Sequence, residues 1–114
     1  MSKKAFDKLL LKAVDDALFS LGDSARQAIY FHLENKFEIA KKDIPANIED
    51  FAEGIEGIFG LGATFLEILI MKNLHKKVGQ PLKWDEGKEL AFVEYVTAAK
   101  QSFLKKKKVK TAKM

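Results

Sequence analysis

The stretch FAEGIEGIFGLGATFLEILI, residues 51–70, decides the fold of this chain. Its first half continues an apolar series that returns every three or four residues, as one face of a helix does. The series is Ile44, Ile48, Phe51, Ala52, Ile55 and Phe59. Gly60-Leu61-Gly62 then interrupts the helix, because glycine is a poor helix former. A further helix follows from Ala63 to Lys77. Its first half is apolar on nearly all sides, which predicts a place in the centre of the core.

Three more helices are predicted around this corner. Residues 3–21 form one, which Gly22 ends, and Ser24 with Gln27 forms a capping box that opens the next, which ends near Phe37. Pro45 is expected at the first position of the third helix, where its missing N–H is tolerated. Asp85 is the expected N-cap of a fifth helix. No segment alternates with period two, so we predict an all-α protein, a compact five-helix bundle with a disordered basic C-terminal tail.

The positive charge is concentrated at the end of the chain. The whole sequence holds 20 basic and 16 acidic residues, a net charge of +4. Without the six lysines of the last ten residues, residues 1–104 hold 14 basic and 16 acidic residues, a net charge of −2. We therefore predict one folded domain over residues 1–104 and a flexible lysine-rich tail over residues 105–114.

The sequence carries no pattern of catalytic or metal-binding residues. It has no cysteine, and neither His32 nor His75 has a histidine or carboxylate partner at the spacing of a zinc or di-iron motif. The glycines of residues 57–62 follow a helix and lack the order of a dinucleotide-binding loop. We therefore predict no enzymatic activity, no catalytic residue, no bound metal and no cofactor.

The N-terminus and the apolar stretches indicate the compartment. Met-Ser-Lys-Lys is not followed by an uninterrupted apolar run, and the apolar stretch of residues 58–71 is short and contains Glu67. A secretory signal peptide needs an uninterrupted apolar run after its basic residues, and a membrane-spanning helix needs about 20 apolar residues. We predict a cytoplasmic protein without a membrane span.

Two charged groups are candidate binding residues. Flexible lysines bind phosphates without reading base sequence. These lysines are Lys105, Lys106, Lys107, Lys108, Lys110 and Lys113. The predicted third helix has an acidic side, which is a solvated face, a docking surface for a basic partner, or a docking surface for the basic tail of the same chain. That side holds Glu49, Asp50, Glu53 and Glu56.

Some single residues also have predicted places. Lys8, Lys12, Asp15 and Asp16 are expected on the outer face of the first helix. Glu67 lies among apolar residues, so it is expected either on a narrow solvent strip or paired, for example with Arg26 or His75. Phe59 is expected in the core at the glycine corner.

The sequence also resembles a known family. The runs AIYFHLE at 28–34, Ile44-Pro45, FAEGIEGIFG at 51–60 and GATFLEILI at 62–70 are similar to the Nitrosopumilus output domain family of archaeal signalling proteins. The resemblance covers about residues 5–79 and rests on helix-packing residues and turn glycines. It implies an all-α archaeal module in the cytosol that contacts or responds to another protein, and it supplies no catalytic residues.

These observations lead to two functional predictions of different kinds. The first is a non-enzymatic helical interaction or output module in archaeal signalling or regulation, with a protein partner or a second copy of itself. The alternative is sequence-nonspecific nucleic-acid binding through the lysine-rich tail.

Overall fold

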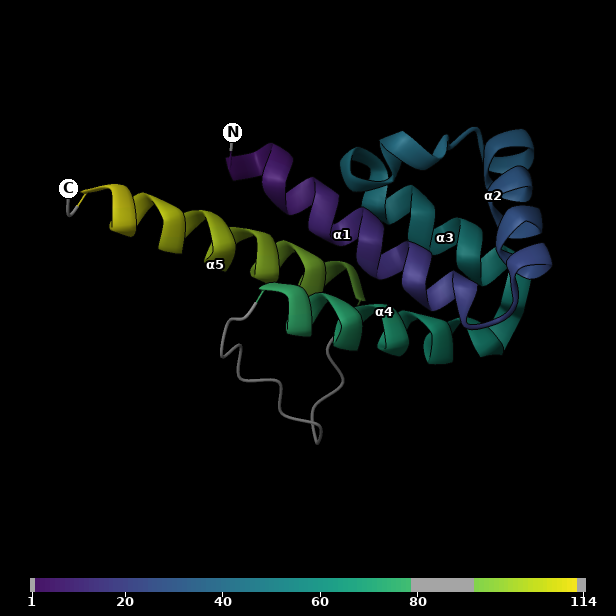
Figure 1. Cartoon of the computed structure of the whole chain (residues 1–114). Coiled ribbons are helices and arrows are strands. Elements are labelled where there is room, and N and C mark those ends of the chain that lie inside the picture. Colours follow the sequence, from purple (N-terminus) through teal and green to yellow (C-terminus); the bar gives the residue numbers. More distant parts are fainter. Residues whose placement is uncertain (1, 79–91, 113–114) are drawn as a thin grey trace.

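The computed structural model describes residues 2–78 and 92–112, and all of its regular structure in these ranges is helical. The α-helices are α1 (Ser2–Phe19), α2 (Asp23–Phe37), α3 (Ile48–Phe59), α4 (Ala63–Val78) and α5 (Phe92–Ala112). Two 3₁₀ segments, η1 (Lys41–Asn47) and η2 (Gly60–Gly62), precede α3 and α4. The predicted all-α class and the five helices are therefore confirmed (Figure 1). The expected N-cap Asp85 lies outside the described residues.

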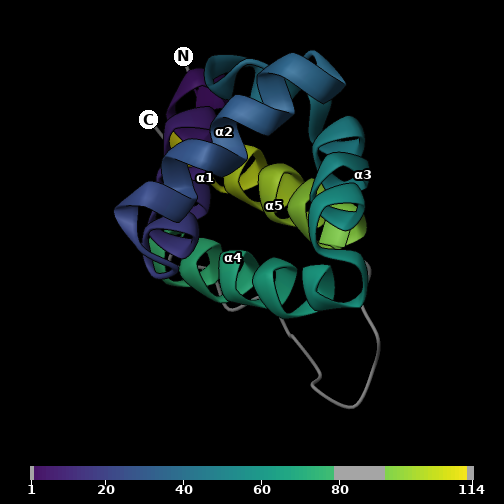
Figure 2. The same cartoon turned by 90° about the vertical axis from the view of Figure 1, so that its right-hand side faces the viewer.

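Helix α1 is the common neighbour of the other elements. It packs most extensively on α4 and also contacts α2, η1 and α5. The amide of Asn73 on α4 donates a hydrogen bond of 3.2 Å to the carbonyl oxygen of Ala13 on α1. Figure 2 shows α4 along the lower edge of the bundle and α3 along its right-hand edge, so each of these helices has one side that faces outward.

The core follows the apolar spacing of the sequence. The buried side of α1 consists of Phe6, Leu10, Ala13, Val14, Ala17 and Leu18. In the same core, Phe51 of α3 packs against Phe92 of α5, with ring centroids 6.1 Å apart. Tyr95 of α5 is the largest fully buried side chain in the described part of the chain. Its hydroxyl lies 3.2 Å from Nδ1 of His75, which gives the buried phenol a polar contact.

The predicted capping box at Ser24 is wrong. Gly22 is the N-cap of α2 in place of Ser24, so α2 begins two residues earlier than predicted, at Asp23. The amide of Gln27 donates to the carboxylate of Asp23 at 2.9 Å instead of reaching back toward Ser24. The helix dipole favours the carboxylate of Asp23 in the first turn, but no side chain caps the free backbone N–H groups at this end of α2.

The segment before α3 also differs from the prediction. Pro45 does not open an α-helix but lies inside η1, and α3 begins at Ile48. The chain is fixed here by two buried residues, Ile39 and Ile44, on either side of the start of η1. The backbone N–H of Ile39 donates to the carbonyl oxygen of Leu33 at 2.9 Å after Glu38 takes a left-handed conformation, with φ of 57°. The tight connection lets η1 pack on α1.

Helix α5 continues beyond the predicted domain end at residue 104. Its backbone is helical through Ala112, so the helix runs past the predicted domain boundary, and the predicted flexibility of residues 105–114 stays a prediction. No glycine or proline occurs in residues 92–112, and lysine is a good helix former, so the lysine run extends the helix. Figure 1 shows this end of α5 projecting past the rest of the bundle.

Candidate interaction surface

The outward side of α4 is apolar in its first half. Leu61 of η2 is 99% exposed, Phe65 is 75% exposed and Ile68 is 36% exposed. Their spacing of four and three places them on one helical face, which we call the α4 strip. The opposite side of the helix is buried and consists of Ala63, Leu66, Ile70, Met71, Leu74 and Val78. The predicted central position of α4 is therefore wrong: the helix packs on one side only.

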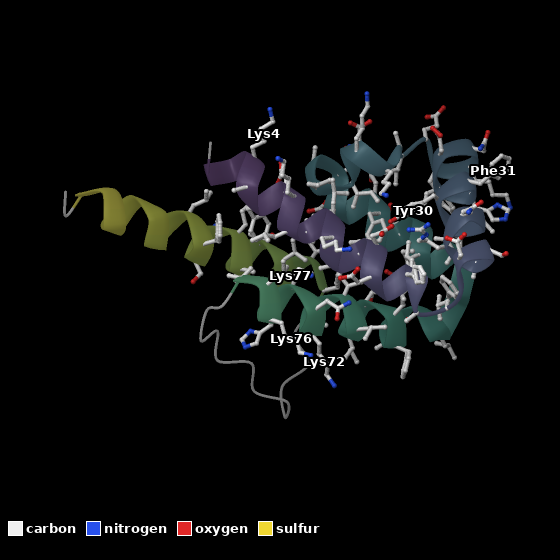
Figure 3. The ribbon with its side chains drawn as sticks, viewed as in Figure 1. Lys4, Tyr30, Phe31, Lys72, Lys76 and Lys77 are labelled. Atoms are coloured by element: carbon white, nitrogen blue, oxygen red, sulfur yellow. The ribbon has the colours of Figure 1, made fainter. Side chains whose placement is uncertain are left out.

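Two lysines continue the α4 strip toward the end of the helix. Lys72 and Lys76 follow Ile68 at intervals of four, and both are exposed. Figure 3 shows them on the side of α4 that faces away from α1, whereas Lys77 lies on the side toward α1. Lys77 forms an ion pair of 3.2 Å with Asp16. Neither Lys72 nor Lys76 has an ion pair with the described part of the chain.

The acidic side of α3 is exposed, and its last member, Glu56, lies close to the glycine corner between α3 and α4. Its members Glu49, Asp50, Glu53 and Glu56 all face solvent. Within the described residues, no lysine, arginine or histidine forms an ion pair with any of them. Their role as a docking surface stays a prediction.

Glu67 is not paired with Arg26 or with His75, the two partners suggested from the sequence. Arg26 is engaged by Asp15 and Asp23, and His75 contacts Tyr95. Glu67 is half-buried, and the charged group that acts on it is the carboxylate of Glu56 on α3. Burial raises the pKa of Glu67, and the negative charge of Glu56 raises it further.

Asp15 is the centre of a polar cluster that the sequence prediction placed in solvent. Arg26 donates from Nη1 to both carboxylate oxygens at 3.2 and 3.1 Å, and the hydroxyl of Tyr30 donates at 2.9 Å. Lys41 of η1 adds an ion pair of 3.4 Å. Burial raises the pKa of Asp15, but the hydrogen bond from Tyr30 and the charges of Lys41 and Arg26 outweigh it and hold the pKa below its ordinary value.

This cluster joins α1, α2 and η1 and has a structural role. Tyr30 has a raised pKa because of burial and its bond to the carboxylate of Asp15. Lys41 also lies 5.0 Å from the centroid of the Tyr30 ring, which adds a cation–π contact. The spacing of Arg26 and Tyr30, one turn apart on α2, is the only sequence signal that could have indicated a shared partner. Asp16, between Lys12 and Lys77, similarly joins α1 to α4.

The lysine-rich end is only partly described. The backbone of residues 105–112 belongs to α5, whereas the side chains of these residues and all of Lys113 lie outside the described part. The candidate contacts of Lys105, Lys106, Lys107, Lys108, Lys110 and Lys113 therefore stay predictions.

Two further features bear on ligands and membranes. In residues 2–78 and 92–112, no group of three or more histidine or acidic side chains is arranged to hold a metal ion. The helical run Lys41–Val78 contains a window that is apolar enough to cross a membrane by length and composition alone, and 33% of that window is buried in the bundle. The run changes direction at Gly60, where φ is 58°. The absence of a membrane span stays a prediction.

Comparisons with known proteins give no match. No family model, no curated protein and no solved structure is similar to this chain at a significant level. The resemblance of residues 5–79 to the archaeal output domain stays a prediction.

Proposed function

We propose that this protein is a helical interaction module that binds a protein partner through the α4 strip. The observation that supports this is the exposure of Leu61 on η2 and of Phe65 and Ile68 on the first half of α4. Full burial of an aliphatic or aromatic side chain of this size contributes about 1.5–3 kcal/mol. Three such residues on one face supply an apolar centre for an interface, and exposed apolar patches of this kind mark interaction sites.

The charges around the α4 strip would select the partner. Acidic residues, Glu56 of α3 and Glu67, lie beside the N-terminal part of the strip, and Lys72 and Lys76 follow its C-terminal end. Charges at the rim of an interface contribute more to specificity and association rate than to affinity. The proposed partner therefore presents an apolar surface with basic residues at one edge and acidic residues at the other.

We further propose a role in archaeal signal output or regulation, a cytoplasmic location and no enzymatic activity. The resemblance of residues 5–79 supports the first two. The lack of a catalytic motif in the sequence supports the third.

Site-specific photo-cross-linking in cells tests the interaction. The photo-reactive amino acid benzoylphenylalanine is placed at position 65 in the α4 strip. Position 31 is the matched control, because Phe31 is also an exposed phenylalanine, 63% exposed on α2. We expect a defined protein adduct from position 65 that is absent from position 31 and is lost when Leu61→Glu is added. Equal labelling from both positions, or no adduct from position 65, would refute the proposal.

A second function is supported by the projecting end of α5. The backbone of residues 105–112 belongs to the part of this helix that extends past the bundle (Figure 1). If all six lysines contact duplex DNA, log K should fall with log salt concentration at a slope of about −5. Full-length protein and a chain ending at Leu104 are compared across a salt series. Equal affinities of the two would eliminate this function.

A further inference from the structure

We propose that the α4 strip is the interface of a homodimer, in which the α4 helices of two copies pack antiparallel about Ile68. This inference rests on the proposed function and names the partner as a second copy of the chain. A two-fold interface uses the same patch twice, so the patch must be complementary to itself when turned through half a circle. The order of apolar and charged residues on the outward side of α4 meets this condition.

The register follows from the spacing of the exposed residues. When Ile68 faces its own copy, residues at equal distances before and after it face each other. Thr64 then lies opposite Lys72 of the partner, and Gly60 lies opposite Lys76 of the partner. All five residues lie on the outward side of α4 or η2, four residues apart, and all are exposed. Glycine at position 60 leaves room for the lysine that crosses it.

This register brings unlike charges together. Glu67 is one turn from Thr64 on α4, so Lys72 of the partner reaches it. Glu56 belongs to the last turn of α3, four residues before Gly60, and its charge acts on Glu67 across the corner, so Lys76 of the partner approaches the same two acids. In the single chain, Glu56 and Glu67 face each other without an ion pair from the described residues. The dimer supplies one lysine for each acid, and it does so twice by symmetry.

The apolar residues are covered by the same arrangement. Ile68 packs on Ile68 of the partner, and the methylene chains of Lys72 and Lys76 lie over Phe65 and Leu61. The contact consists of one helix pair and the edge of α3, which is at the low end of interface size. We therefore expect a dissociation constant on the order of micromolar.

A second copy fits this face better than an anionic membrane surface. On an anionic bilayer, Lys72 and Lys76 would meet the headgroups favourably, but Glu56 and Glu67 beside the apolar residues would have no basic partner there. A partner with lysines at one edge neutralises these acids, whereas an anionic bilayer repels them. The charge pattern therefore favours protein over lipid.

Charge reversal in the full-length chain tests the register. Sedimentation velocity over a concentration series measures the dimer dissociation constant of wild type, Glu56→Lys, Lys76→Glu and the double variant. Each single change places like charges together twice, so we expect at least tenfold weaker dimers. The double change restores an opposite pair, so we expect affinity within threefold of wild type. Lys8→Glu, at an exposed position of α1, should change nothing.

Several results would overturn the dimer. A wild-type monomer at all concentrations would do so, as would single variants with unchanged affinity or a double variant without recovery. Benzoylphenylalanine at position 65 of the purified protein should yield a covalent dimer. An adduct within residues 79–91 of the same chain, or with vesicles containing phosphatidylserine, would assign the strip to another occupant. If the purified protein is monomeric but position 65 still captures a different protein in cells, the dimer fails and the proposed function stands.

Discussion

The substitution Gly54→Ala tests how closely α2 and α3 pack. A Cβ atom at position 54 would lie 2.7 Å from Cδ2 of Leu33 and 3.4 Å from the ring of Phe37. Ordinary contacts between carbon atoms are about 3.5–4.0 Å, so Leu33 must move by roughly 1 Å. Leu33 is completely buried and has little room to do so.

The expected loss of stability is the difference of two effects. Alanine in place of glycine stabilises a helix by about 0.8–1.0 kcal/mol, whereas an added methyl group in a filled core costs about 1–3 kcal/mol. Because Leu33 is held on all sides, the cost should lie in the upper part of that range. We expect Gly54→Ala to lower the free energy of unfolding by about 1–2 kcal/mol.

Gly57→Ala is the matched control, one turn along the same helix. Its Cβ would meet only Phe37, with the ring tip Cζ at 2.9 Å. Phe37 is half-buried, so its ring can swing outward, and the gain in helix propensity should roughly cancel the cost.

Urea denaturation followed by circular dichroism measures both variants. Gly54→Ala should move the midpoint down without a change in slope, and Gly57→Ala should leave it within about 0.5 kcal/mol of wild type. In a Leu33→Ala background, Gly54→Ala should instead stabilise, because the contact is gone. A Gly54→Ala protein as stable as wild type would refute the close-packing argument.

Three other substitutions follow from the structure. Asp15 has a lowered pKa when folded, so its stabilisation is present above its ordinary pKa and is lost as pH falls through the folded value; Asp15→Asn should flatten the acid limb of a stability–pH curve. Glu67 has a raised pKa, so its contribution is lost as pH rises through the folded value; Glu67→Gln should stabilise the protein near neutral pH by up to about 0.5 kcal/mol in urea titrations, and a loss there would contradict the pairing of two acids. Phe59 is half-buried and not the core residue that the sequence predicts, so Phe59→Ala should cost about 2 kcal/mol in thermal melts, below the range of about 3–5 kcal/mol for a fully buried phenylalanine.

Local sequence spacing determined most of the helices. The three- and four-residue spacing on α1 fixed its buried side, and Gly60-Leu61-Gly62 placed the corner between α3 and α4 correctly. The exposed acids of α3 also follow from spacing, because a strongly polar face opposite an apolar one turns to water. These features depend on residues that are neighbours along one helix.

Only the tertiary structure decided which apolar and charged groups are covered. Helical spacing alone places Asp15 on the surface of α1, but in the folded chain Arg26 and Tyr30 of α2 and Lys41 of η1 contact it. Phe65 looks like a core residue until α1 is seen to cover only the opposite side of α4. Helical spacing states which side chains share a face, but whether that face is buried depends on how many neighbours the chain brings to it from distant positions. The sequence therefore determined the helices of this protein, and the packing of α1 against α4 decided which apolar face remains for a partner.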